Sequence, residues 1–365
     1  MITNMTLLTS PVLIGINIYF FTITVISFFF AHLKRLRYSA LIIGALMLMV
    51  VISTRDLSYG DAGTYYKYYV AYPNPVDIKF EFLFDKLIAL SKLLGLSPEL
   101  FFFITTAIQF ALLFFGFYRL TKALNLEKYF EFIIYLFISG FTFYFQTVET
   151  IREGLALSIV VLAVALYVEG KLKSSIICLF ISFLFHSSTI ILLPLIFLRR
   201  ISNKKLLILT TILLITSSFI DKYIVLLAKI LNLNYILLRL ELYRDFGGGS
   251  KTVLLRVILI FVSVIAFYFL IEKILPHEIE NINLLKFYIY MSTFLFIAVP
   301  FQELARRNLF RFSYFIPFFV AIIIEKQEFF PKKKIPILLI ILVGTFLYHN
   351  IFLQSYHAMV GLLNW

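Results

Sequence analysis

Apolar blocks of about 17 to 22 residues recur along almost the whole chain, and they constrain its fold more than any other feature of the sequence. Each block has about the length of a helix that crosses the ~30 Å hydrocarbon core of a bilayer. Only 15% of the residues are charged, whereas soluble globular domains contain about 25%. These observations exclude an ordinary soluble fold. They predict an all-α, polytopic integral membrane helical bundle.

The apolar blocks predict ten full spans in one bundle, with both chain termini outside. Lysine and arginine are then more frequent in the inner loops, as is usual for membrane proteins. The net charge of +13 is therefore mainly a signal of topology and does not indicate nucleic-acid binding. We expect one membrane domain over residues 1–365, with outer loops at 55–99 and 221–251. The predicted spans are 12–31, 38–54, 100–118, 129–147, 151–168, 206–220, 252–271, 284–299, 309–324 and 335–353.

One further apolar segment, residues 174–198, has basic residues at both ends. A simple span would place one of these basic clusters outside. We therefore expect a broken or re-entrant helical hairpin, whose two half-helices meet near His186 and return to the inner side. Interrupted helices in membranes usually line a cavity.

The first outer loop opens with a polar, tyrosine-rich stretch that begins at Arg55. A carboxylate such as Asp61 can accept a proton or a sugar hydroxyl, Arg55 can hold phosphate, and Tyr65 offers a stacking face. The alternative is a polar loop with an interfacial tyrosine belt.

Further along this loop, apolar residues recur at helical spacing and predict an amphipathic helix at the membrane interface. They are Phe82, Leu83, Leu87, Leu90, Leu93 and Leu94.

Two other outer positions carry arginines at the start of a predicted span. Glu149, Arg152 and Glu153 share one helix face. The helix dipole disfavours a cation at a helix N-terminus, so an arginine there indicates a bound anion. A local ion pair between Glu149 and Arg152 is the alternative.

The second arginine group is stronger, with three arginines within six residues. Guanidinium groups can grip diphosphate oxygens in a bidentate manner, although snorkelling to lipid headgroups would also place them here. The group comprises Glu303, Arg306, Arg307 and Arg311.

His186 is the most polar point of its segment and lies at the expected helix break. A neutral imidazole there can accept a proton from a hydroxyl, or it can simply bond to backbone freed by the break. The single Cys178 excludes a disulfide framework, and no HExxH or CxxC motif is present. No metal and no cofactor are expected.

Together these residues resemble the EpsG/Wzy-like family of bacterial polysaccharide (O-antigen, capsule and exopolysaccharide) polymerases. The resemblance is carried by four short motifs in the same order. They are Arg55…Gly60-Asp61…Tyr65, Ile151-Arg152-Glu153-Gly154-Leu155-Ala156, Phe185-His186-Ser187-Ser188 and Arg307…Arg311-Phe312-Ser313-Tyr314-Phe315.

The resemblance implies a membrane glycosyltransferase that moves a growing glycan from undecaprenyl diphosphate to a lipid-linked repeat unit. The reaction would take place on the outer face of the bacterial cytoplasmic membrane. A chain-length regulator and a flippase of the same pathway are further candidate partners. Our hypothesis assigns Arg152, Arg307 and Arg311, with Arg55 and Arg306, to the diphosphate, and Tyr65, Glu149 and Glu303 to the rest of the substrate. His186 ranks first as the base, ahead of Asp61 and Glu153.

Two other functions fit some of these features. A glycosyltransferase that uses a polyprenyl-phosphate sugar carries an acidic pair in its first outer loop, which Asp56 and Asp61 imitate. A transporter of lipid-linked saccharides needs ionisable residues at mid-membrane depth. Here the charges concentrate at the outer edge, which favours the polymerase.

Overall fold

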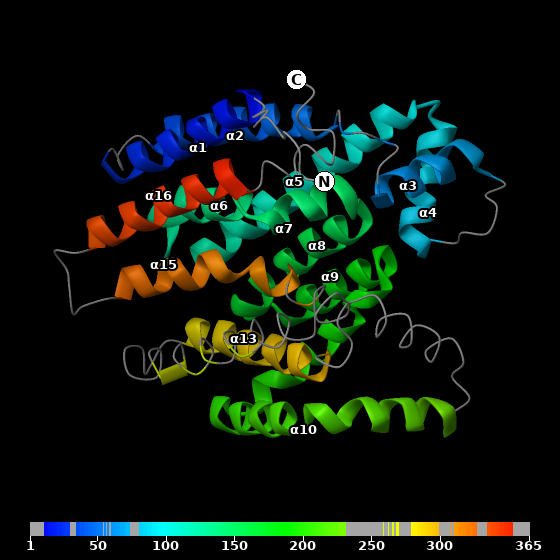
Figure 1. The fold of residues 1–365 in the computed structure, drawn as a ribbon, viewed down its shortest axis with the longest axis vertical. Coiled ribbons are helices and arrows are strands. Elements are labelled where there is room, and N and C mark those ends of the chain that lie inside the picture. Colours follow the sequence, from blue (N-terminus) through cyan, green and yellow to red (C-terminus); the bar gives the residue numbers. More distant parts are fainter. Residues whose placement is uncertain are drawn as a thin grey trace, which may run out of the picture. The chain divides into compact units, whose positions relative to one another are not determined.

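The computed structural model describes most of the chain, and regular structure within its described residues is entirely helical (Figure 1). The chain divides into two compact units, Met1–Leu193 with Pro317–Trp365, and Pro194–Ile316. The single domain expected over residues 1–365 stays a prediction. The described residues are 11–29, 34–53, 55, 57, 60–73, 80–230, 258, 262, 265, 268–269, 279–298, 308, 310–326 and 334–352.

Three helices of the described residues are long and apolar enough to cross a membrane. They are α2 (Lys34–Ser53), α5 (Pro98–Ala123) and α8 (Ile151–Val168), and each lies on a predicted span. A bent pair of helices is a fourth candidate. Ten full spans are therefore not confirmed, and the span predicted at 252–271 lies largely outside the described residues. Shorter apolar helices are α1 (Pro11–Phe29), α9 (Leu172–Phe185) and α16 (Lys334–Phe352).

The span predicted over residues 129–147 is bent by 71° and not straight. Its first arm comprises η1 (Glu127–Tyr129) and α6 (Phe130–Ile138), and its second comprises α7 (Phe141–Tyr144) and the π-helical turn η2 (Phe145–Glu149). Gly140 lies at the bend with an extended backbone (φ −89°, ψ 147°). Glycine is among the poorest helix formers, which explains why the span breaks there. The second arm ends one residue before α8.

Helix α8 forms the core of the first unit. Helices α5 and α9 both pack along it, and its side chains are apolar nearly all round, as is typical of a buried helix. Ser182 of α9 donates a hydrogen bond to the carbonyl oxygen of Ala156 over 3.0 Å. Hydroxyl-to-backbone bonds of this kind hold helices together where water is absent. At the start of α8, Gly154 lies so close to Gln146 that a Cβ would be 2.1 Å from its carbonyl oxygen.

The first predicted outer loop contains two helices, α3 (Gly60–Ala71) and α4 (Phe82–Leu93). The amphipathic helix predicted there is confirmed as a helix. Phe84 and Ile88 on one side of α4 belong to a buried cluster with tyrosines of α3 and phenylalanines of α5. The opposite side of α4 is exposed and mainly apolar, with Lys86 among its apolar residues, and Leu93 there is 83% exposed. Its position at a membrane interface stays a prediction.

Ion pairs gather where α2 begins and where α5 and α8 end. Arg37 of α2 pairs with buried Glu131 of α6, and Arg119 of α5 pairs with Glu169, the residue after α8. The sequence predicts the inner side for both arginines. Both pairs lie at the same end of α2, α5 and α8. This end is opposite to the one at which α8 begins. A third pair joins Lys128 to Glu325 of α15 (Ile316–Lys326).

The second unit contains α10 (Asn203–Ile230) and α13 (Ile279–Ala298), which pack together. The hydroxyls of Thr210 and Thr293 lie 2.7 Å apart between them. Helix α10 continues ten residues beyond the predicted span 206–220, through the first part of the predicted outer loop 221–251. The rest of that loop lies outside the described residues.

We expect Gly154→Ala to destabilise the protein by more than about 2 kcal/mol, because the new methyl group would overlap the Gln146 carbonyl. Gly344→Ala in α16 is the matched control, since no atom lies within 4 Å of its added Cβ. It should be neutral or stabilising by up to about 1 kcal/mol. Thermal unfolding in detergent measures both. Equal stability of the two variants would contradict the close approach at Gly154.

Candidate functional site

Three segments that are distant in sequence meet at the carboxylate of Glu81, the residue that precedes α4. Arg152, in the first turn of α8, donates from Nη1 to Oε2 of Glu81 over 2.5 Å. Ser187 donates to Oε1 from its backbone nitrogen over 3.0 Å and from its hydroxyl over 2.9 Å. Nδ1 of His186 lies 3.2 Å from the same Oε1. The predicted outer loop, the start of α8 and the end of α9 therefore form one polar site.

The break in the apolar segment that follows α8 positions His186. Helix α9 ends at Phe185, His186 has an extended backbone (φ −152°, ψ 111°), and the 3-10 helix η3 (Ser187–Arg200) begins at the next residue. The predicted break near His186 is confirmed, whereas the return of the chain to the inner side stays a prediction. The imidazole is buried, with His186 only 5% exposed. Its Nε2 has no hydrogen-bond partner among the described residues.

Glu81 is ionised at neutral pH despite its partial burial. Burial disfavours the charge of its carboxylate and raises its pKa. The contact with His186, the charge of Arg152 and the N–H of Ser187 outweigh this effect and lower the pKa of Glu81 to about 2. The site therefore contains a permanent anion between an arginine and a histidine.

The guanidinium group of Arg152 is held from two sides. One of its nitrogens binds Glu81, and its Cζ lies 4.9 Å from the centre of the Phe80 ring. A cation over an aromatic face is stabilised by the ring electrons. Nε of Arg152 is buried and has no hydrogen-bond partner among the described residues. The arginine is thus fixed in place, and its Nε–H is a donor that a further acceptor could use.

Glu149 lies beside the start of α3. A Cβ on Gly60 would be 3.2 Å from Oε2 of Glu149, and Gly60 has φ +57°, a conformation that favours glycine. The Gly60-Asp61 pair therefore neighbours the turn that leads into α8. Asp61 is exposed in the first turn of α3, whereas Glu153 is buried in the first turn of α8.

Arg55 and Tyr65 lie in the interior of the first unit. Arg55 is 3% exposed, and its Nη1 donates to the carbonyl oxygens of Thr147 and Val148 over 2.6 and 3.0 Å. Its Nη2 donates to the Thr106 hydroxyl over 2.7 Å. Arg55 thereby joins the end of α2 to α5 and to turn η2. Tyr65 is buried in the aromatic cluster under α4.

The late arginine group is only partly described. Arg311 belongs to the second unit, is 1% exposed and donates from Nη1 to Oδ1 of Asn308 over 3.0 Å. Glu303, Arg306 and Arg307 lie outside the described residues. The role of this group in anion binding stays a prediction.

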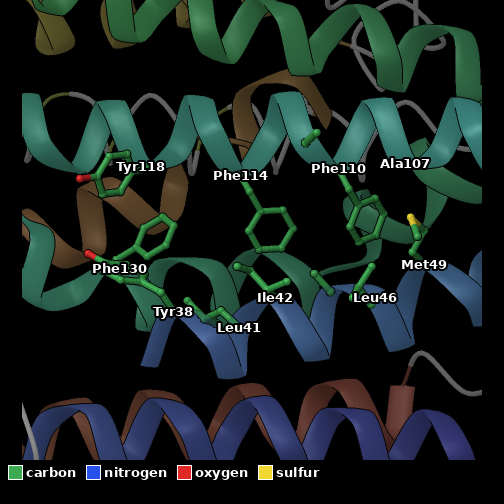
Figure 2. Close-up of a pocket in the computed structure, with 12 residues that line it drawn as sticks. Tyr38, Leu41, Ile42, Leu46, Met49, Ala107, Phe110, Phe114, Tyr118 and Phe130 are labelled. Carbon is green, nitrogen blue, oxygen red and sulfur yellow. The ribbon is translucent and has the colours of Figure 1, made fainter. Parts of the chain in front are cut away.

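An apolar groove of about 630 Å³ lies between α2 and α5. Figure 2 shows Phe110 and Phe114 of α5 facing Ile42 and Leu46 of α2 across it. One end is formed by Tyr38 with Tyr118 and Phe130. The other end includes Ala107, which adjoins the threonine that binds Arg55. The groove thus runs from the ion-paired end of these helices toward the end that carries the polar site.

The model of the EpsG family matches residues 39–363, which is nearly the whole chain. The chain belongs to the EpsG family. This family comprises Wzy-like polysaccharide polymerases, so the resemblance seen in the sequence is confirmed. No curated protein and no solved structure matches the chain. Family membership and the apolar helices indicate a membrane protein of polysaccharide biosynthesis with a polymerase type of function.

In this EpsG family member, the structure joins three of the four motifs that carry the resemblance. Tyr65 of the first motif and Ile151 of the second lie in one buried cluster, and Arg152 of the second motif and His186 of the third share Glu81 as a partner. Sequence reasoning gave Glu81 no role. The one sequence feature that could have indicated a role was the position of this carboxylate between two phenylalanines at the start of the amphipathic helix. Its partners Arg152 and Ser187 follow only 71 and 106 residues later.

Replacement of Glu81 by Gln should weaken the acid sensitivity of the protein. The pKa of Glu81 is lower in the folded chain (about 2) than its ordinary value of 4.5, so the unfolded chain binds the proton first as the pH falls. Its contribution, on the order of 2–3 kcal/mol, is present above about pH 4.5 and is lost toward pH 2. Thermal unfolding at about pH 7, 4.5 and 3 should show a steeper loss for wild type than for Glu81→Gln. Parallel curves would contradict this environment of Glu81.

We expect Arg55→Lys to lower stability by about 1–3 kcal/mol, because one ammonium cannot reach the acceptors that the guanidinium group joins. Arg200→Lys, at an exposed position of η3, should leave stability unchanged. Thermal unfolding and activity are measured on the same samples. Full stability of Arg55→Lys with lost activity would instead place Arg55 in direct contact with substrate.

Proposed function

We propose that this protein polymerises lipid-linked oligosaccharide repeat units. It transfers the growing glycan from polyprenyl diphosphate to an acceptor repeat unit on the outer face of the bacterial cytoplasmic membrane. The observation that carries the proposal is the meeting of Arg152 and His186 at Glu81, in a chain of the EpsG family. The bilayer and an undecaprenyl-diphosphate-linked oligosaccharide are its partners.

The chemistry requires a base for the acceptor and a cation for the leaving group. The acceptor hydroxyl oxygen attacks the anomeric carbon, its proton passes to His186, and the bond from that carbon to the diphosphate oxygen breaks. Arg152 stabilises the charge that develops on the departing diphosphate, and a fixed donor is most effective at this task. Diphosphate is a good leaving group once its charge is stabilised.

The remaining candidates take supporting roles in this proposal. Arg311, with Arg306 and Arg307, contributes further positive charge for the diphosphate. Glu149 and Asp61, which are neighbours through Gly60, bind sugar hydroxyls. Glu303 is assigned to the substrate as well. Glu153 is the reserve candidate for the base, and Arg55 and Tyr65 support the site from the interior.

The groove between α2 and α5 is suited to the lipid portion of the substrate. Its lining is almost wholly hydrocarbon (Figure 2). One end includes Ala107, the neighbour in sequence of the Thr106 that binds Arg55. A polyprenyl chain placed there would leave its diphosphate near the end of α2, beside Arg55.

The test is an assay of the purified protein with a lipid-linked repeat unit from the source strain, with products resolved by length. We expect a ladder of polymers from wild type and at least a ~100-fold loss in Arg152→Gln and in His186→Gln. Lys67→Gln, which removes an exposed charge from neighbouring α3, is the matched control and should retain activity.

Each other outcome rejects a specific part of the proposal. Full activity of a variant removes that residue from the mechanism. Addition of one sugar from a lipid monophosphate would identify the other type of glycosyltransferase. Absence of products, with movement of the lipid-linked saccharide across vesicle membranes, would identify a transporter.

A further inference from the structure

The two oxygens of the Glu81 carboxylate face different groups. Oε2 binds Arg152, while Oε1 faces Nδ1 of His186 and accepts both hydrogen bonds from Ser187. We propose that Glu81 is a positioning residue that keeps the proton of His186 on Nδ1, so that Nε2 is the atom that accepts the proton of the sugar hydroxyl. This inference rests on the proposed function and assigns the base to a single nitrogen.

The carboxylate is anchored to the same stretch of chain as the imidazole. Ser187 is the next residue after His186, and its backbone N–H and its hydroxyl both donate hydrogen bonds to Oε1 of Glu81. The 3.2 Å distance from Nδ1 is within hydrogen-bonding range, but the ring is not turned so that an Nδ1–H would point straight at the oxygen. Such bonds in unliganded sites often straighten when substrate binds. Rotation of the ring upon substrate binding would complete the contact.

The contact with Glu81 disfavours the opposite tautomer. With the proton on Nε2, the lone pair of Nδ1 would face the lone pairs of an anion. With the proton on Nδ1, the donor faces the carboxylate and Nε2 carries a free lone pair. An acceptor hydroxyl would then satisfy Nε2.

The same arrangement stabilises the product of the proton transfer. When Nε2 takes the hydroxyl proton, the ring becomes a cation beside the Glu81 anion. The hydroxyl oxygen forms the new bond to the anomeric carbon, and the electron pair of the broken bond leaves with the diphosphate. Water then removes the proton from His186 before the next cycle. A carboxylate that orients a histidine and stabilises its cation performs the same task in serine hydrolases.

The direct test is nitrogen NMR of the protein labelled with ¹⁵N-histidine. The chain has five histidines, and the His186 signals are those missing from His186→Gln. Spectra are recorded near about pH 8.5, above the ordinary histidine pKa of about 6.5, because the neutral tautomers are distinguished there. We expect the Nδ1–H form in wild type. An Nε2–H form in wild type would overturn the inference without any variant.

Two variants separate the role of Glu81 toward His186 from its role toward Arg152. Glu81→Gln should shift His186 toward the Nε2–H form, because an amide can present a donor to Nδ1. Arg152→Gln removes the other partner of Glu81 and should leave the Nδ1–H form in place. An unchanged tautomer in Glu81→Gln, or an equal change in both variants, would overturn the inference.

Activity supplies the second readout. Glu81→Gln should lower kcat by at least about 100-fold, and Glu81→Asp should recover part of that loss because the anion is kept. Glu99→Gln, an exposed carboxylate at the start of α5, is the matched control and should retain kcat. If wild type makes no polymer, the proposed function fails. The NMR measurement of the His186 tautomer would still test the role of Glu81 in that case. Full kcat in Glu81→Gln overturns that role.

Discussion

An ionised carboxylate that is mostly withdrawn from water needs compensating charges and donors, and this requirement organises the site of this protein. Glu81 meets the requirement with Arg152, His186 and Ser187, which come from the start of α8 and the break after α9. Because Glu81 precedes α4, the same contacts tie the predicted outer loop to α8 and to the end of α9. Loss of the Glu81 carboxylate would remove the shared partner of Arg152 and His186.

The first unit separates its charges into two groups at opposite ends of its long helices. Arg37 and Arg119 form ion pairs at one end, and the Glu81 site lies at the other. Between them, α8 has no charged residue from Gly154 to Val168. A pathway for a charged ligand through this helix layer would need polar groups at intermediate depth. Within the first unit, this distribution agrees with the proposal of chemistry at one surface.

The sequence predicted those features that depend on local pattern. Hydropathy located α2, α5 and α8, and the basic residues around segment 174–198 predicted the break at His186. The bend at Gly140 was not predicted, because the apolar run continues through it. The pairing of Glu81 with Arg152 was not predicted either, since no periodicity relates residues 71 positions apart. The partners of Arg55 were not predicted either: its position after α2 indicated a phosphate-binding side chain, and its guanidinium group binds the carbonyl groups of Thr147 and Val148.

Helix α4 also bears on where the reaction takes place. Its exposed apolar edge leaves it suited to lie at the boundary between headgroups and hydrocarbon, and Glu81 is the residue immediately before it. A helix seated at that boundary would fix the height of Glu81, and with it the height of Arg152 and His186, relative to the lipid surface. That is the level at which the diphosphate of a membrane-embedded polyprenyl chain lies. The bilayer itself would then align the substrate bond with the residues that act on it.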